Sequence, residues 1–76
     1  MDISEASFIV NLGIHVRKIR EKKGLSQQDL ADDCGITQNQ VGRIERAEIN
    51  TTVKTLVRIA NALDIEPKEL LDFPLK

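Results

Sequence analysis

Residues 26–46, which read SQQDLADDCGITQNQVGRIER, carry the strongest structural signal in this chain. Ser26 is followed three residues later by Asp29, and Thr37 is followed three residues later by Gln40. Each pair matches a capping box, in which side chains and backbone N–H groups satisfy one another at the start of a helix. The stretch therefore predicts two short helices in succession, the second from about residue 38 to residue 46.

The segment between these two helices is predicted to be a tight turn. The first helix ends at Cys34, and Gly35 can adopt the left-handed conformation that stops a helix. Ile36 follows in the turn, where it can cover the core beneath both helices. Two helices joined by a short turn that contains glycine are typical of the helix-turn-helix motif, whose second helix enters the major groove of DNA. We therefore predict this motif at about residues 26–46.

The outward face of the second helix carries side chains suited to reading duplex DNA. Val41 and Ile44 are expected to face inward. The positions expected to face outward are Gln38, Asn39, Gly42, Arg43 and Arg46. Gln and Asn can bond an adenine edge with two hydrogen bonds, and Arg can do the same to guanine. Gly42 would allow a close approach to the groove because it has no side chain. The alternative is a solvated polar face with one weak glycine.

The chain before this motif reads as one more helix. Its apolar residues recur at helical spacing, at Ile9, Leu12, Val16 and Ile19. Ser7 is the predicted cap at its start, and Gly24 stands where a glycine would end it.

The chain after the motif supplies the last two predicted helices. Thr52 caps a fourth helix that extends to Leu63, and Pro67 fits the first position of a short fifth helix. The predicted fold is all-α, a compact domain of five helices that occupies residues 1–76.

Composition bounds the kinds of protein this chain can be. Its 76 residues are 41% apolar and 30% charged, with a formal net charge of −1, a globular balance. The net charge alone neither favours nor opposes a nucleic-acid partner, because residues 15–24 are basic and residues 64–76 are mildly acidic. The chain has no run of 18 apolar residues and no signal-peptide pattern, so no membrane partner is predicted and the expected location is the cytoplasm.

Metal, redox and catalytic chemistry find no support in the sequence. One cysteine and one histidine cannot build a tetrahedral metal site, so we predict no metal and no cofactor. Cys34 is interpreted as a small core residue and His15 as a surface residue of the first helix. Asp29, Asp32 and Asp33 lie on one helix with neither a nucleophile nor an enclosed pocket in sight, so we predict that the protein is not an enzyme.

Most of the chain resembles the Cro/lambda-repressor (Xre-type) family of helix-turn-helix regulators. The resemblance extends from about Leu12 to Leu71. It rests on residues 24–31 (GLSQQDLA), 35–38 (GITQ), 41–46 (VGRIER), 50–52 (NTT) and 55–63 (TLVRIANAL). The resemblance implies a lambda-repressor-like DNA-binding domain and a transcriptional regulator that reads double-stranded DNA.

The resemblance also implies roles for single residues. Its positions for reading bases match Gln38, Asn39 and Arg43. Positions that contact phosphates match Gln27, Gln40, Asn50 and Arg46, and Gln27 would also brace the recognition helix. In several relatives a buried ion pair joins the first and third helices, and its positions match Arg20 and Glu45.

The loop after the second helix of the motif departs from the family pattern. Where relatives usually carry glycine and then a cation, this chain has Ala47 and Glu48. Glu48 would face a surface lined with phosphates, so this loop is expected to lie further from DNA than in relatives. Thr51 replaces a common proline and leaves the choice of cap at the next helix open between Thr51 and Thr52.

The C-terminal part, about residues 53–76, is the predicted dimer surface. Its end is rich in large apolar residues, which are Ile65, Leu70, Leu71, Phe73 and Leu75. Inverted-repeat operators need two recognition helices about 34 Å apart, which favours a homodimer. The alternative is that Phe73 and Leu75 fold back onto their own domain.

The sequence as a whole predicts a sequence-specific transcriptional regulator of the repressor or autoregulating controller type. Its partner would be an inverted-repeat operator in double-stranded DNA, and no small-molecule effector is expected. The alternative is an antitoxin-like module that neutralises a protein partner and binds DNA secondarily.

Overall fold

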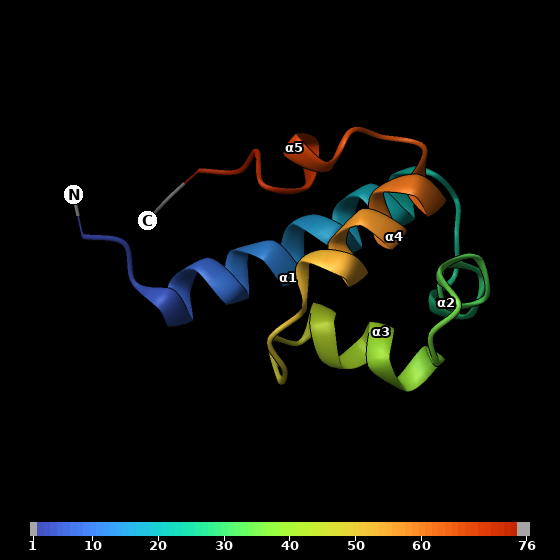
Figure 1. Cartoon of the computed structure of the whole chain (residues 1–76), viewed down its shortest axis with the longest axis horizontal. Helices are drawn as coiled ribbons and strands as arrows, with labels where there is room; N and C mark the ends of the chain where they lie inside the picture. The colour runs from blue at the N-terminus through green and yellow to red at the C-terminus, as the bar shows by residue number, and fades with distance from the viewer. Residues whose placement is uncertain (1, 75–76) are drawn as a thin grey trace.

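The computed structural model describes residues 2–74 and contains five α-helices. In chain order they are α1 (Glu5–Lys22), α2 (Gln27–Cys34), α3 (Gln38–Glu45), α4 (Val53–Leu63) and α5 (Pro67–Leu70). No β-strand occurs in this range, which confirms the all-α prediction. Figure 1 shows α1 and α4 crossing the middle of the molecule, with α5 above them, α3 below them and α2 at one end.

Local capping chemistry explains where three of the helices begin. The Ser26 hydroxyl accepts from the backbone N–H of Asp29 at 3.0 Å, and the Asp29 carboxylate accepts from the N–H of Ser26 at 2.9 Å. Thr37 and Gln40 form the same reciprocal pair at α3. Thr52, rather than Thr51, caps α4. The predicted capping boxes at α2 and α3 are therefore confirmed.

The prediction for the start of α1 was wrong by one turn. The cap is Ser4, whose hydroxyl accepts from the backbone N–H of Ser7 at 3.2 Å. Ser7 therefore lies inside the helix. Both serines suit a cap by residue type, and the structure uses the earlier one, so that the helix includes Glu5 and Ala6 as well.

The turn between α2 and α3 has the predicted form. Gly35 is left-handed with φ of 70°, and its neighbour Ile36 donates a backbone hydrogen bond to the carbonyl of Ala31 at 3.1 Å. These bonds satisfy carbonyl groups at the end of α2 that the helix itself leaves unpaired. The turn sets the direction in which α3 leaves α2.

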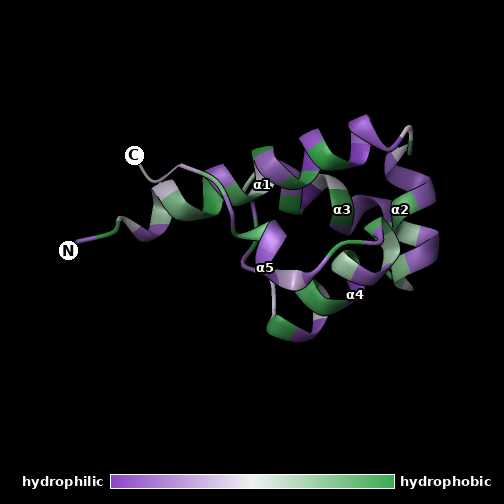
Figure 2. Ribbon diagram, turned by 90° about the horizontal axis from the view of Figure 1, so that it is seen from above, coloured by the Kyte–Doolittle hydropathy of each residue, from purple (hydrophilic) through white to green (hydrophobic). Residues whose placement is uncertain are grey.

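Every helix contributes to one hydrophobic core. Its buried members are Leu12, Val16, Leu30, Ala31, Cys34, Val41, Ile44, Ile59, Ala60, Leu63 and Leu70. The helix pairs α2–α3, α2–α4, α1–α3, α4–α5 and α1–α5 are in contact. Figure 2 shows polar and apolar residues alternating along α1, as expected for a helix with one face on this core.

The C-terminal segment folds back along α1. Phe73 packs against Phe8 with ring centroids 5.0 Å apart, and against His15 at 5.5 Å. His15 lies half-buried on α1, and its Nε2 donates to the carbonyl oxygen of Glu69 at 2.7 Å, a contact that the sequence did not indicate. For Phe73 the fold-back alternative is therefore correct. Leu75 lies outside the described residues.

Candidate nucleic-acid interface

The predicted base-reading residues lie together on the exposed face of α3. Gln38 and Asn39 are exposed in its first turn, and Arg43 is exposed one turn later. Val41 and Ile44 are buried on the opposite face, with side chains only 1% and 5% exposed. The helix therefore presents amide and guanidinium groups to solvent while its apolar side packs on the core.

Gln40 has a structural function at the start of this helix. Its Oε1 accepts from the backbone N–H of Thr37 at 2.9 Å. This bond uses the amide oxygen, which leaves the amide nitrogen as the group that suits an anionic partner. The structure thus places Gln40, predicted to contact phosphate, in the capping box at the exposed end of α3.

Gly42 does not open the reading face as the sequence suggested. It is buried, and a methyl group added to it would lie 2.7 Å from Nη1 of Arg46. The long Arg46 side chain lies back over the glycine, because a residue four positions ahead on a helix lies on the same face. The guanidinium group of Arg46 therefore fills the space that Gly42 leaves.

Glu48 joins the two arginines at the end of α3. Its carboxylate accepts from Arg46 Nε at 2.6 Å, and its other oxygen lies 3.9 Å from Arg43 Nε. The hydrogen bond from Arg46 lowers the pKa of Glu48, and the bond to Glu48 raises the pKa of Arg46. Glu48 therefore lies against the end of α3, paired with its arginines.

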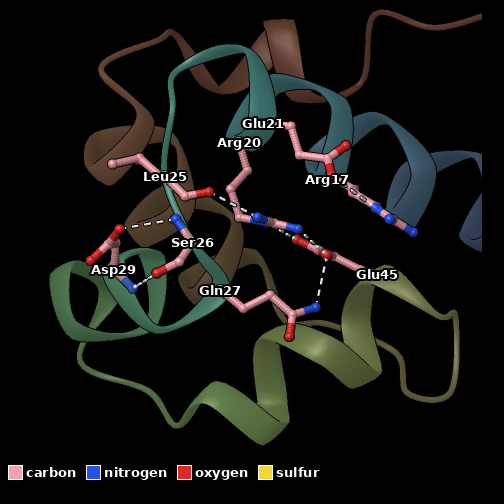
Figure 3. Close-up of polar contacts among 8 residues, drawn as sticks. All are labelled: Arg17, Arg20, Glu21, Leu25, Ser26, Gln27, Asp29 and Glu45. Carbon is pink, nitrogen blue, oxygen red and sulfur yellow. Dashed lines mark hydrogen bonds and ion pairs between the residues drawn. The ribbon is translucent and has the colours of Figure 1, made fainter.

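A buried ion pair fastens α3 to α1, as Figure 3 shows. Arg20 donates to both carboxylate oxygens of Glu45, from Nε at 2.7 Å and from Nη2 at 3.0 Å. Their side chains are 9% and 3% exposed. Arg20 Nη1 also donates to the carbonyl oxygen of Leu25 at 2.8 Å, and the bond to Glu45 raises the pKa of Arg20. The two-point geometry holds both the position and the rotation of α3.

Gln27 brings α2 into this network. Its Nε2 donates to Glu45 Oε1 at 3.0 Å, which links the start of α2 to the end of α3. Its carbonyl oxygen points away from the pair in Figure 3. Gln27 is half-buried at the first position of α2, so it can brace α3 and still reach a ligand from the surface.

Gly13 is a positioning residue that the sequence analysis did not identify. A methyl group at Gly13 would lie 2.6 Å from the carbonyl oxygen of Ile44 and 2.7 Å from that of Glu45. The backbone of α3 thus rests directly on α1. The sequence offered one indication of this role, since Gly13 lies inside an otherwise regular helical pattern, where a glycine is unfavourable unless close packing requires it.

Asn50 lies exposed in the loop between α3 and α4, where it lines a hollow together with Gln40 of α3, another predicted phosphate contact. It also lines a shallow apolar hollow of about 310 Å³ together with Phe8, Ile49 and Leu56. Thr51 Oγ1 lies buried in this loop and has no hydrogen-bond partner within residues 2–74.

The described part of the chain was also searched for metal ligands, reactive cysteines and membrane-spanning helices. No group of three or more His, Cys, Asp or Glu residues within 2–74 could hold a metal ion. Cys34 is buried, and burial raises the pKa of its thiol, as expected for a core residue. None of the helices in this range is both long and apolar enough to cross a bilayer.

Comparison with known proteins agrees with this architecture. Residues 16–70 match the helix-turn-helix family model. The chain is 39% identical over 62 residues to control protein C.BamHI of Bacillus amyloliquefaciens, which covers 80% of this chain and 76% of that protein. It is 38% identical over 71 residues to control protein C.SmaI of Serratia marcescens, covering 93% of this chain and 79% of that protein.

A solved structure is similar to this chain in both fold and sequence. The restriction-modification controller protein C.AhdI from Aeromonas hydrophila superposes with a TM-score of 0.81 at 42% identity. The alignment covers 82% of this chain and 94% of that one. The two proteins are therefore similar in amino-acid sequence as well as in the arrangement of their helices.

Proposed function

This chain belongs to the helix-turn-helix family of DNA-binding transcriptional regulators, and on that basis we propose that it is a sequence-specific controller. In this proposal α3 enters the major groove of double-stranded DNA. Gln38, Asn39 and Arg43 read base edges there. The relatives named control proteins support a controller over other kinds of regulator.

The observation that carries this proposal is an exposed polar face on a helix whose C-terminal end is bonded to both α1 and α2. Glu45, at the end of α3, is bonded to Arg20 of α1 and Gln27 of α2. Hydrogen bonds to bases discriminate only when their donors are held in register with the groove. Fastening α3 at its C-terminal end leaves its N-terminal turn, with Gln38 and Asn39, projecting toward a ligand.

Residues around α3 would hold the DNA backbone. Gln27, Gln40, Asn50 and Arg46 are the proposed phosphate contacts, and each contributes an amide or guanidinium donor from the start of α2, from α3 or from the loop after it. Contacts of this kind position a protein on the duplex without specifying sequence.

We propose that the protein acts as a homodimer on an inverted-repeat operator. Val53 and Val57, one turn apart on α4, have exposed fractions of 76% and 41%, and Leu71 is 45% exposed. These residues lie within the 53–76 surface predicted from the sequence. Since Phe73 packs on its own domain, the exposed valines of α4 are the better candidates for the contact. The protein would respond in the cytoplasm to its own concentration, without a small-molecule effector.

The experiment that tests this function is selection of bound sites from a random duplex library, with non-specific competitor and a stated salt concentration. We expect enrichment of an inverted repeat whose half-site centres are one helical turn apart. Sedimentation at tens of micromolar protein should show a dimer. Absence of any enriched sequence would contradict the proposal and favour the antitoxin-like module, for which co-purification of a second small chain is the matching observation.

A further inference from the structure

Glu48 occupies the place of an anion beside the α3 arginines. Its carboxylate bonds Arg46 Nε at 2.6 Å and lies 3.9 Å from Arg43 Nε. A guanidinium group offers the same N–H donors to a carboxylate and to a phosphate. Within residues 2–74, Arg46 has this carboxylate as its ion-pair partner. One N–H donor of the arginine proposed to contact the DNA backbone, that of Nε, is thus already engaged in the free protein, and its positive charge is paired.

The location of Glu48 makes this pairing relevant to DNA. The loop after α3 lies on the α3 side of the molecule, and α5 lies on the opposite side (Figure 1). The Arg46 guanidinium also lies over Gly42, so it is directed back along α3 and toward Glu48. A phosphate can therefore bond Arg46 Nε only when the Glu48 carboxylate is displaced or shares this donor, and at the other guanidinium N–H groups it meets the negative charge of Glu48.

We propose that Glu48 is a positioning residue that acts as an internal substitute for a DNA phosphate and weakens sequence-independent DNA binding by holding Arg46. The proposal rests on the DNA-binding function proposed above. Sequence-independent binding draws on little besides cation–phosphate contacts. Withholding one cation from them therefore lowers the affinity for arbitrary DNA and keeps more of the protein available to find an operator.

The ion pair between Arg46 and Glu48 is weak enough to reduce DNA binding without preventing it. The side chains of Arg46 and Glu48 are 55% and 48% exposed, so solvent screens the pair and its net contribution is small. A dense row of phosphates can compete with a single half-exposed carboxylate. Removing the negative charge of Glu48 is therefore expected to raise the affinity for random-sequence DNA only a few-fold.

The test compares the affinity of wild type and Glu48→Gln for a random-sequence duplex, measured by fluorescence anisotropy at several salt concentrations. Gln keeps the shape of the side chain and removes its charge. We expect binding about three- to fivefold tighter at low salt. The slope of log affinity against log salt should steepen by about 0.9 for each bound protomer, because one more cation reaches a phosphate.

Two further variants separate this mechanism from simpler ones. Glu66→Gln makes the same charge change at an exposed ion pair, Glu66–Lys68 at 3.3 Å, at the start of α5 and far from α3. It is expected to leave the affinity nearly unchanged. In an Arg46→Ala background, Glu48→Gln is expected to lose its effect, because the glutamate acts through that arginine. Circular dichroism checks that each variant is folded.

The outcomes are distinguishable. No binding of wild type to any duplex would overturn the DNA-binding function itself. With wild-type binding intact, three results would overturn the role of Glu48: no gain in Glu48→Gln, an equal gain in Glu66→Gln, or a gain that persists without Arg46. Persistence would mean that Glu48 acts by repelling DNA or through its second neighbour, Arg43, and not through Arg46. A gain that depends on Arg46 and is absent from Glu66→Gln supports the proposal.

Discussion

Gly13 of α1 and Ile44 of α3 are in such close contact that a methyl group on Gly13 would lie 2.6 Å from the Ile44 carbonyl oxygen. The obstacle is backbone on both sides, so neither partner can rotate away. The position of the recognition helix on the domain therefore depends on the absence of one side chain, in addition to the buried ion pair next to it.

Replacing Gly13 by Ala is expected to destabilise the protein by about 1–3 kcal/mol, because the added methyl group forces α1 and α3 apart. Gly42→Ala is the matched control. Its methyl group would meet only the flexible end of Arg46, and alanine gains about 0.5–1 kcal/mol over glycine inside a helix. Urea unfolding of both variants measures the difference. Equal stability of the two variants would contradict the proposed backbone contact.

Replacing Glu45 by Gln is expected to cost about 3–5 kcal/mol, because it leaves the buried Arg20 guanidinium without its counter-charge. The control is Glu21→Gln, which breaks the exposed pair between Arg17 and Glu21 at 3.5 Å. That change should cost no more than about 1 kcal/mol. Thermal and urea unfolding provide the comparison. A small effect of Glu45→Gln would mean that the pair is poorly desolvated in solution.

Replacing Arg43 by Ala is expected to weaken operator binding by about 1–3 kcal/mol and to relax the preference at one base pair of each half-site. Gln27→Ala is the contrasting variant, and it should weaken binding to all sequences about equally. Both are measured on the selected site and on its single-base variants. If Arg43→Ala left affinity and preference unchanged, the assignment of the reading face would be wrong.

The capping box of α2 predicts a specific pH dependence. The backbone N–H and the hydroxyl of Ser26 lower the pKa of the Asp29 carboxyl below its usual value of 3.8. A carboxyl whose pKa is lower in the folded state stabilises the protein above the unfolded pKa, and this contribution is lost as the pH falls through the folded pKa. Wild type should therefore exceed Asp29→Asn in stability at pH 7.

The same advantage should shrink in acid, which urea unfolding in steps from pH 7 down to about pH 2 would show. Ser26→Ala, which removes the hydroxyl, should bring the Asp29 pKa measured by NMR closer to its usual value. A stability difference independent of pH would show that the Asp29→Asn variant is weakened for steric rather than electrostatic reasons.

Local signals in the sequence predicted the motif region well. The caps at Ser26, Thr37 and Thr52 and the stop at Gly35 all depend on groups within a few residues of each other, so their chemistry can be read along the chain. The exception was the start of α1. Ser4 and Ser7 are both suitable caps by residue type, so the residues alone did not distinguish them, and the structure uses Ser4.

Contacts between distant residues were not predictable from composition or spacing. The Arg20–Glu45 pair entered the prediction only through the family resemblance, since no local pattern joins residues 25 positions apart. Gly42 was expected to open the reading face, and it is covered by Arg46 instead. The bond from His15 to Glu69 joins residues 54 positions apart, and no pattern in the sequence indicated it.

Signals along the chain are sufficient to indicate five helices and the polar face of the third one, because capping and helical periodicity act over at most a few turns. The contacts that fix α3 in place, and the side chains that surround its polar face, form only when the helices pack together. Gly13 supports the backbone of α3, Arg20 and Gln27 fasten its end, and Glu48 engages its arginine. These relationships depend on how closely separate helices approach, and that distance is set by packing of the whole core.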